Sequence, residues 1–475
     1  MKSFRWTDHE VRAALRLPMD NADEESTYSG VSTDTRSLAP DALFVALAGP
    51  NFDAHNYLGD AAKAGATGMV VSRLPGNAPR GIRYYEVPST LEALGRLARH
   101  RRDRLAMRVV GIVGSNGKTT TKDLVGAALA PTFRVHATAG NLNNQIGVPL
   151  TLLGTPEDAE AVVVEMGTNE PGEIEILTEI VRPDAAIVTS IGEEHLEKLV
   201  DLEGVLREET AILAGLRSGA PSFVAEEPAA LVSRARELRG DAPIGIAGFS
   251  PGANLRPEGG ADGISYLPDG STRWSWEGHE VTLPLPGRHN VRNALLALGL
   301  AREWGVDPAA AMAGIARVPS PKLRGEWRRI GDMRVLADCY NSNPPGVLAA
   351  LDLLASVPSE GAKVAVLGTM RELGSQSTSI HERVATTVLE HLRHGLDSVI
   401  ATGDFAKAMH GSEKEFGDRL ILNPDPVAAY GQVSGKFRGN ETVLLKASRG
   451  EALERWLPLL ERDFENNSKF KIQNS

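Results

Sequence analysis

The stretch of residues 109–124 constrains the fold more than any other part of this chain. An apolar run rich in β-branched residues, 109–113, stops at a glycine turn, and residues 118–124 then follow a pattern typical of a helix. A strand, a glycine loop, Lys-Thr and a helix, in this order, form the context that a phosphate-binding loop needs. The stretch therefore predicts an α/β sheet that binds phosphate groups where a strand ends.

Each residue type in this loop suits phosphate chemistry. Glycines let the backbone approach phosphate oxygens closely, and the free N–H groups at a helix N-terminus attract an anion. Lys118 would supply a positive charge to the terminal phosphates, and the Thr119 hydroxyl would ligate Mg²⁺. The other residues expected at the nucleotide here are Gly114, Ser115, Asn116, Gly117 and Thr120. The widest form of the motif has a glycine where this chain has Ile112, so a tight strand-to-helix turn with an exposed lysine is the alternative.

Composition excludes several classes of protein. The formal net charge of −10 argues against nucleic acid as the main partner. One cysteine, Cys339, excludes an internal disulfide framework and fits a reducing compartment. No apolar run approaches the roughly 18 residues needed to span a bilayer, and the start of the chain lacks the apolar core of a signal peptide. We therefore expect a cytoplasmic protein without membrane insertion.

The length of 475 residues predicts about three domains. Strand and helix patterns divide the chain into α/β blocks at residues 1–105, 106–318 and 319–475. In the first block, Ser89 would cap a helix, and the basic cluster at 99–104 would mark its end and a domain junction. Paired prolines at 319 and 321 resist helix and strand alike and mark a credible hinge. The third block alternates strands at 335–337, 363–367, 398–401 and 442–445 with helices that include 381–394 and 451–460.

Two further strands of the second block end in residues that can bind a metal. Residues 161–167 read as a buried strand that ends in Glu165, and residues 185–195 as one that leads to acids and His195. Because ligands bind beyond the carboxyl ends of parallel strands, Lys118, Glu165 and His195 are expected at one rim. Glu165 would be a Mg²⁺ carboxylate, while His195 is either a ligand or a structural histidine.

Other polar groups are less specific. His289 and Asn290 precede an apolar helix at 291–304, and with Asn293 one turn later they could frame a base or a ribose. Polar residues also gather at 32–36 and 51–55, where ordinary solvated loops are the favoured interpretation.

At this point the motifs carry a family resemblance. The loop at 114–120 resembles the ATP loop of the Mur ligases, which build the peptidoglycan precursor. More selective segments are Gly-Asn-Leu-Asn-Asn-Gln-Ile-Gly-Val-Pro at 140–149, Glu-Met-Gly-Thr-Asn-Glu-Pro-Gly-Glu-Ile at 165–174 and Asp-Cys-Tyr-Asn-Ser-Asn-Pro at 338–344. They are similar to the family member that adds D-alanyl-D-alanine to UDP-N-acetylmuramoyl-tripeptide, and the resemblance spans essentially the whole chain.

The resemblance implies both fold and activity. It implies a UDP-sugar domain at 1–105, a central phosphate-loop ATPase domain with a mostly parallel sheet at 106–318, and a mobile, Rossmann-like α/β domain at 319–475. It implies ATP-dependent amide-bond formation through an acyl phosphate, with ATP and Mg²⁺ as cofactors and a monomeric enzyme. The alternatives are a related ligase with another acceptor and a nucleotide-binding regulator that has lost ligation. The identity of the third residue of the tripeptide stays open.

The resemblance also assigns site residues. Lys118 would contact the transferring phosphate, Thr119 and Glu165 would bind Mg²⁺, and His195 would hold a second metal. The positions matched to the nucleotide are His289, Asn290, Asn293, Arg324 and Asp338. Those matched to the substrates are Thr33, Asp34, Thr35, Arg36, Asn141, Asn143, Asn144, Asn341, Asn343, Lys446, Ser448 and Arg449.

Two departures from the family pattern stand out. Glu209 occupies the position where the family commonly has a lysine carbamylated by CO₂, an anionic group that orients Mg²⁺. Our hypothesis is that the Glu209 carboxylate replaces the carbamate as a catalytic group, and the alternative is a solvated helix glutamate. Thr369 stands where the family usually shows aspartate, which leaves the role of its loop open.

Overall fold

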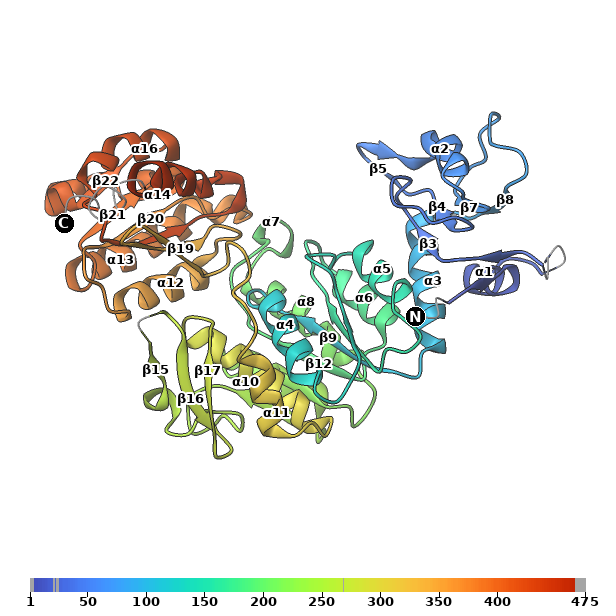
Figure 1. The fold of residues 1–475 in the computed structure, drawn as a ribbon, viewed down its shortest axis with the longest axis horizontal. Helices are drawn as coiled ribbons and strands as arrows, with labels where there is room; N and C mark the ends of the chain where they lie inside the picture. The colour runs from blue at the N-terminus through green and yellow to red at the C-terminus, as the bar shows by residue number, and fades with distance from the viewer. Residues whose placement is uncertain (1–3, 20–21, 23–24, 268, 466–475) are drawn as a thin grey trace, which may run out of the picture.

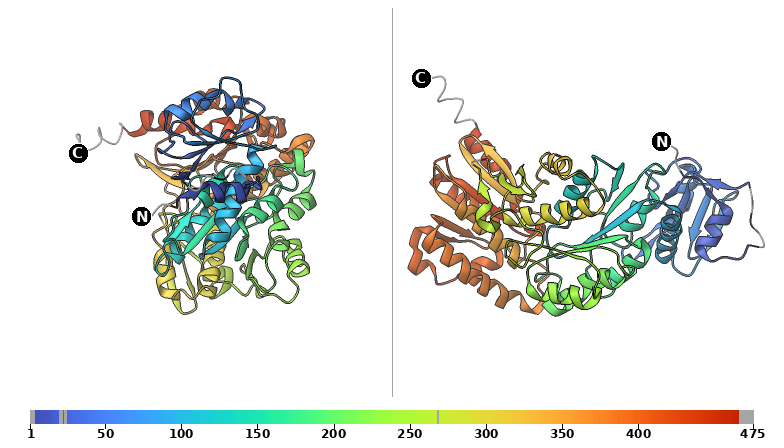
Figure 2. Two further views of the ribbon diagram at one scale, coloured as in Figure 1. Left: turned by 90° about the vertical axis from the view of Figure 1, so that its right-hand side faces the viewer. Right: turned by 90° about the horizontal axis from the view of Figure 1, so that it is seen from below.

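The computed structural model describes residues 4–19, 22, 25–267 and 269–465, and its main sheets organise the chain into three α/β domains (Figure 1). The domains follow one another in space as in sequence, so the N-terminal and C-terminal domains lie at opposite ends of the central one (Figure 2). No helix within the described ranges is long and apolar enough to cross a membrane.

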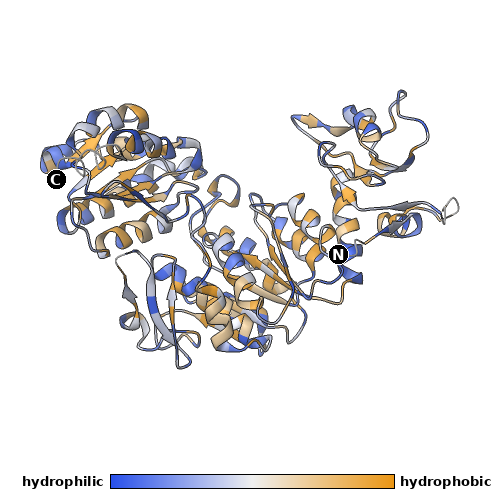
Figure 3. Cartoon of the chain, in the orientation of Figure 1, coloured by the Kyte–Doolittle hydropathy of each residue, from blue (hydrophilic) through white to orange (hydrophobic). Residues whose placement is uncertain are grey.

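The central sheet has six parallel strands in the order β10-β11-β9-β12-β13-β14. The strands are β9 (Arg108–Val113), β10 (Val135–Ala137), β11 (Ala161–Glu165), β12 (Ala185–Val188), β13 (Ser222–Ala225) and β14 (Ile244–Ala247). Alternate side chains of β9, β11 and β12 enter two separate apolar clusters, one on each face of the sheet. Burial on both faces explains why these strands are continuous apolar runs in the sequence (Figure 3).

Helices cover both faces of this sheet. On one face, α10 (Arg288–Glu303) and α11 (Pro308–Ile315) pack against α4 (Lys118–Leu129), the helix that follows the phosphate loop. On the other face lie α6 (Glu173–Val181) and α8 (Leu202–Ala214). The domain also contains a three-stranded antiparallel sheet that the sequence pattern did not predict: β15 (Ser265–Tyr266), β16 (Thr272–Trp276) and β17 (His279–Leu283).

The N-terminal domain is built on a parallel sheet in the order β3-β4-β7-β8, formed by Val31–Ser32, Leu43–Val45, Gly68–Val71 and Arg83–Glu86. The predicted Ser89 cap is confirmed: Ser89 accepts a hydrogen bond from the Glu92 N–H at the start of α3 (Thr90–Arg104). Arginines at the other end of α3 bond to the central domain, Arg101 to the Thr155 carbonyl and Arg102 to the Val181 carbonyl. The basic cluster therefore links the N-terminal domain to the central domain through hydrogen bonds.

The C-terminal sheet runs β18-β19-β23-β20-β21-β22, with only the edge strand β18 antiparallel. Its strands are Glu326–Ile330, Met333–Asp338, Thr442–Lys446, Lys363–Leu367, Ser398–Ala401 and Leu420–Leu422 in that order. The prediction of one helix over 451–460 is wrong. Ala452 has a left-handed backbone (φ 53°), which confines the α-helix there, α17, to Trp456–Leu460 after short 3₁₀ turns.

Candidate active site

The site is a cavity of about 510 Å³ at the carboxyl ends of strands from two domains. Its walls come from the phosphate loop and the ends of β11 and β12, from the start of α10, and from the ends of β19 and β23 in the C-terminal domain. The predicted residues that line it are Ser115, Asn116, Gly117, Lys118, Thr119, Thr120, Asn141, Asn143, Asn144, Glu165, His195, His289, Asn290, Asn293, Arg324, Asp338, Asn341, Lys446 and Arg449.

The phosphate loop requires glycine at its two predicted positions. Gly114 has φ +124°, and a Cβ there would lie 2.3 Å from the Thr189 hydroxyl oxygen. Gly117 has φ +84°, and a Cβ there would lie 2.8 Å from Nδ2 of Asn293. Gly117 precedes α4 without a side-chain cap, so the first N–H groups of the helix stay available to an anion.

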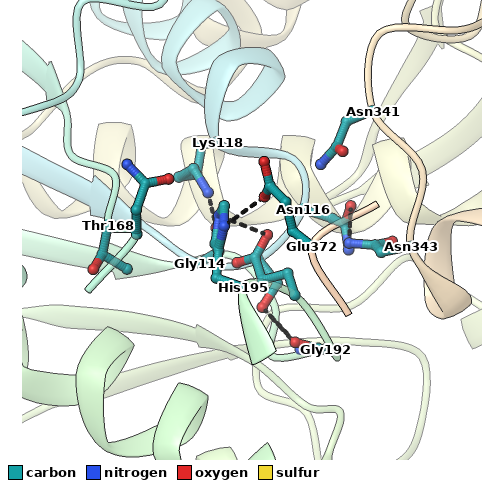
Figure 4. A network of polar contacts seen from close by, with 12 residues as sticks. Gly114, Asn116, Lys118, Thr168, Gly192, His195, Asn341, Asn343 and Glu372 are labelled. Atoms are coloured by element: carbon teal, nitrogen blue, oxygen red, sulfur yellow. Dashed lines mark hydrogen bonds and ion pairs between the residues drawn. The ribbon is translucent and has the colours of Figure 1, made fainter. Parts of the chain in front are cut away.

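Lys118 is the cation of this loop, and its ammonium group donates to the carbonyl of Gly114 (Figure 4). Desolvation alone would lower the pKa of Lys118. The charges of Glu194, Glu209 and Glu165 outweigh it and raise that pKa. Lys118 is therefore held as a fixed positive charge at the cavity.

Glu165 projects from the end of β11, whose neighbour in the sheet is β9. The Thr119 hydroxyl lies 3.2 Å from Oε1 of Glu165, and Nδ2 of Asn143 donates to the same oxygen at 2.9 Å. The second oxygen, Oε2, is buried and has no hydrogen-bond partner. The ends of β9 and β11 thus bring Lys118, Thr119 and Glu165 to the rim that the sequence predicted.

His195 follows β12 in a left-handed conformation, with φ 51°. Its Nδ1 lies 2.7 Å from Oε2 of Glu372, a residue of the C-terminal domain (Figure 4). Burial would lower the pKa of His195, but the hydrogen bond to Glu372 and the charge of Glu194 raise it. Its Nε2 lies 3.9 Å from Oε2 of Glu194, which leaves this nitrogen without a hydrogen bond to that carboxylate.

Glu209 does not line the cavity. It is fully buried on α8, behind the phosphate loop, and its Oε2 accepts a hydrogen bond from the Gly114 N–H at 2.7 Å. Burial raises its pKa to about 7. The solvated-glutamate alternative is wrong, and the structure places the carboxylate where it supports the loop backbone. A glutamate side chain is shorter than a carbamylated lysine, and from α8 the Glu209 carboxylate reaches only the backbone of the phosphate loop.

The start of α10 forms a second wall. Asn290 donates from Nδ2 to the carbonyl of Pro286 at 2.7 Å, and Asn293 donates to Oδ1 of Asn290 at 3.3 Å. Desolvation lowers the pKa of His289 to about 4, so this imidazole is neutral near pH 7. Apart from Arg292, which pairs with Glu227, the wall therefore offers neutral polar groups.

The C-terminal domain supplies the third wall. The Arg324 guanidinium carbon lies 3.8 Å from the centroid of the Tyr340 ring, and that of Arg449 lies 5.3 Å from it. Lys446 pairs with Asp338 at 2.8 Å across the ends of two neighbouring strands. This wall carries both aromatic surface and positive charge.

Several predicted residues lie outside the cavity lining. Asn343 caps α12 (Pro344–Ser356) and donates from Nδ2 to Oδ1 of Asn116 at 3.0 Å, a contact between domains. Ser448 accepts a hydrogen bond from the Arg371 N–H, and Gly114 is buried and does not line the cavity. Residues 33–36 lie in the N-terminal domain away from this cavity, where the Arg36 side chain holds the pKa of Asp34 at about 2.

Other residues line the cavity that were not predicted as site residues from the sequence, among them Thr168, Thr189, Ser190, Glu194, Tyr340 and Glu372. Ser190 and Glu194 follow β12, so the strand-end rule that selected His195 could have found them. Glu372 also follows a strand, β20, but in another domain, so its contact with His195 depends on how the two domains pack.

Known protein domains match two long segments of this chain. The Mur ligase middle domain matches residues 112–301, and the domain described as "Mur ligase, glutamate ligase domain" matches residues 323–449. The UDP-N-acetylmuramoyl-tripeptide–D-alanyl-D-alanine ligase of Bacillus subtilis is 33% identical over 91% of this chain and 93% of its own length. The Escherichia coli enzyme of the same name is 34% identical over 90% and 92%.

Solved structures extend the similarity to the whole fold. A crystal structure of MurF from Acinetobacter baumannii covers 97% of this chain and all of its own, with a TM-score of 0.86 and 28% identity. The MurF ligase of Thermotoga maritima, solved in complex with ADP, covers 92% of this chain and 98% of its own, with a TM-score of 0.78 and 26% identity.

Proposed function

Because the chain belongs to the Mur ligase family, we propose that it joins D-alanyl-D-alanine to UDP-N-acetylmuramoyl-tripeptide at the expense of ATP. The observation that carries this proposal is the gathering of Lys118, Thr119, Glu165 and His195 around one cavity, at the phosphate loop. A regulator that had lost ligation would have no need to keep these four groups together.

The chemistry explains why such a cavity is needed. A carboxylate is a poor acyl donor, because an oxide would have to leave. Transfer of the γ-phosphoryl group of ATP to a carboxylate oxygen gives an acyl phosphate and ADP. The amine of D-alanyl-D-alanine then attacks the carbonyl carbon, the C–O bond to phosphate breaks, and the amine loses a proton. The products are the amide, ADP and inorganic phosphate.

Lys118 would act on the first step. Two anions, the substrate carboxylate and the γ-phosphate, must approach each other, and a fixed ammonium group lowers that repulsion. The first N–H groups of α4 and the Gly114–Gly117 loop would bind the remaining phosphate oxygens. Glu209 would hold the loop in place through the Gly114 N–H.

The donor set fits Mg²⁺, whose preferred ligands are oxygen atoms. We propose Thr119 and Glu165 as its ligands, with His195 at a second ion, and the buried, unpaired Oε2 of Glu165 supports this. Over residues 4–19, 22, 25–267 and 269–465, no group of three or more His, Cys, Asp or Glu can hold a metal alone. That suits Mg²⁺, which binds through one or two carboxylates together with substrate phosphates. When bound, it offsets phosphate charge.

The remaining assignments place the other parts of the substrates. We propose that residues 33–36 of the domain at 1–105 face the uridine diphosphate, and that Asn141, Asn143 and Asn144 meet the tripeptide arm. Asn341, Asn343, Lys446, Ser448 and Arg449 of the domain at 319–475 would line its side of the cleft. His289, Asn290, Asn293, Arg324 and Asp338 would surround the nucleoside of ATP, in the domain at 106–318 and at the junction beyond it.

The C-terminal domain would close on the central one through the segment around Pro319 and Pro321, which has no regular secondary structure between α11 and β18. Closure would keep water from the acyl phosphate. We also propose that the enzyme works as a monomer in the cytoplasm, a reducing compartment that suits a chain with one cysteine.

A coupled assay of ADP release tests the function. We expect turnover only when ATP, UDP-N-acetylmuramoyl-tripeptide and D-alanyl-D-alanine are all present. Turnover with a single amino acid in place of the dipeptide would identify a ligase with another acceptor. Nucleotide binding without any turnover would identify a regulator.

A further inference from the structure

Glu194 is a buried carboxylate of the cavity that the assignments above leave without a role. Its side chain is only 6% exposed, yet it lines the cavity together with Lys118 and His195. Its Oε1 is buried without a hydrogen-bond partner. A buried carboxylate oxygen is costly to leave unpaired, so this one marks a place where a cation or another donor is missing.

The neighbouring imidazole defines where that cation would bind. His195 uses Nδ1 for Glu372, and its Nε2 lies 3.9 Å from Oε2 of Glu194. Two ligands that each lie about 2.1 Å from one Mg²⁺ ion are at most about 4.2 Å apart. A hydrogen bond between the two groups would be shorter, at about 3 Å. Neighbouring octahedral ligands lie about 3.0 Å apart and opposite ones about 4.2 Å. The separation of 3.9 Å is too long for a direct hydrogen bond and lies within the span that two ligands of one ion can cover.

We propose that Glu194 and His195 together hold the second divalent cation of the active site, with Glu194 as its anionic protein ligand. The inference rests on the proposed nucleotide site, because phosphate oxygens would complete the coordination of the ion. It reassigns to Glu194 the role that the sequence suggested for Glu209. The Oε1 of Glu209 is also buried without a partner, but Glu209 lies outside the cavity lining and its Oε2 already bonds to the Gly114 N–H.

Glu372 fits this arrangement as a supporting residue. A metal-binding histidine usually donates its other ring N–H to a carboxylate, which fixes the orientation of the ring. The Nδ1 contact of 2.7 Å with Glu372 matches that pattern. Because Glu372 belongs to the C-terminal domain, the second cation site would be complete only when that domain is in place.

Counting bound Mn²⁺ tests the proposal without relying on catalysis. The full-length protein is titrated with Mn²⁺ in the presence of AMPPCP, and free Mn²⁺ is measured by electron paramagnetic resonance. We expect two Mn²⁺ ions per chain in the wild type, and one tight ion in Glu194→Gln. Losing an outer-shell partner already costs a metal site about 10- to 100-fold in affinity, so the second ion should weaken by at least that factor. Glu194→Asp, which keeps the charge, should retain a weakened second site.

Matched variants separate the possible outcomes. Glu193→Gln removes the neighbouring carboxylate, which pairs with Arg383 instead, and should leave both Mn²⁺ ions in place. A second ion that survives in Glu194→Gln, or that is lost in Glu209→Gln but not in Glu194→Gln, overturns the proposal. One ion in the wild type with AMPPCP bound overturns it while leaving the proposed function intact. Failure of the wild type to bind AMPPCP would instead contradict the proposed function.

Discussion

His195 and Glu372 lie 177 positions apart in sequence, yet the imidazole Nδ1 of the first lies 2.7 Å from a carboxylate oxygen of the second. The contact joins the loop after β12 to the C-terminal domain. Nearby, Nε2 of Gln376 donates to the carbonyl of Val200 at 2.7 Å, and Asn343 donates to Asn116 at 3.0 Å. A small number of polar contacts at the active site therefore connects the two domains.

Removing the Glu372 charge should loosen this connection. We expect Glu372→Gln to broaden the range of separations between the central and C-terminal domains in the ligand-free protein. Partly exposed ion pairs contribute at most about 1 kcal/mol, so the population ratio should change by about fivefold or less. Single-molecule energy transfer between the domains measures it. Glu360→Gln, an exposed glutamate of the same domain, is the control, and equal distributions in both variants would show that the contact does not hold the domains.

Lys118 should be essential for phosphoryl transfer. Removing a preorganised group that stabilises the transition state costs about 10²- to 10³-fold in kcat. We expect Lys118→Met to lower kcat by at least that factor. Steady-state ADP release with all substrates saturating measures the effect. Lys198→Met removes an exposed lysine that pairs with Glu170, and it should retain the wild-type kcat. A similar loss in both variants would count against a specific role for Lys118.

Alanine substitutions at Gly117, the N-cap of α4, and at Gly126, within α4, should have opposite effects. In Gly117→Ala the new Cβ would meet the Asn293 side chain at 2.8 Å, in a backbone conformation with positive φ, so nucleotide affinity should fall by about tenfold or more. In Gly126→Ala the Cβ meets nothing within 4 Å, and the helix should gain about 0.5–1 kcal/mol of stability. Calorimetric titration with ADP and urea unfolding measure the two effects. Unchanged ADP affinity in Gly117→Ala would contradict the loop geometry.

Glu209 should make stability depend on pH. Burial raises its pKa to about 7, above the value of 4.5 for a free glutamate, so the native state binds more protons than the unfolded state between these values. The free energy of unfolding should therefore fall as the pH rises from about 4.5 to about 7, and then level off for this group. Glu209→Gln keeps an acceptor for the Gly114 N–H and cannot ionise. Its urea unfolding curves should lose that part of the pH dependence, and an unchanged slope would show that Glu209 does not titrate there.

Much of this site could be predicted from the sequence, because the ends of parallel strands lie at one edge of their sheet. The run before Gly114 and the run before Glu165 each predicted a buried strand, and their pairing follows from the fold class. Glu194 lay within the same signal. By contrast, the contacts of Glu372 with His195 and of Asn343 with Asn116 join two domains, and no local pattern encodes such contacts.

The prediction of local structure failed where the backbone takes a conformation that is unusual for its residue type. Alanine favours helices, yet Ala452 is left-handed and interrupts the helix predicted over 451–460. The family resemblance singled out Glu209 by its spacing from His195. Where its carboxylate lies depends on how α8 packs behind the loop. Packing, rather than sequence spacing, decided both cases.

The central claim, amide formation through an acyl phosphate, is tested most directly by following oxygen. The tripeptide substrate is prepared with both oxygens of its reacting carboxylate as ¹⁸O and converted with ATP and D-alanyl-D-alanine. If the carboxylate attacks the γ-phosphate, one ¹⁸O must leave with phosphate and the other must stay in the amide. Mass spectrometry should therefore find inorganic phosphate with one ¹⁸O for each amide formed. Amide formation with unlabelled phosphate would contradict the account.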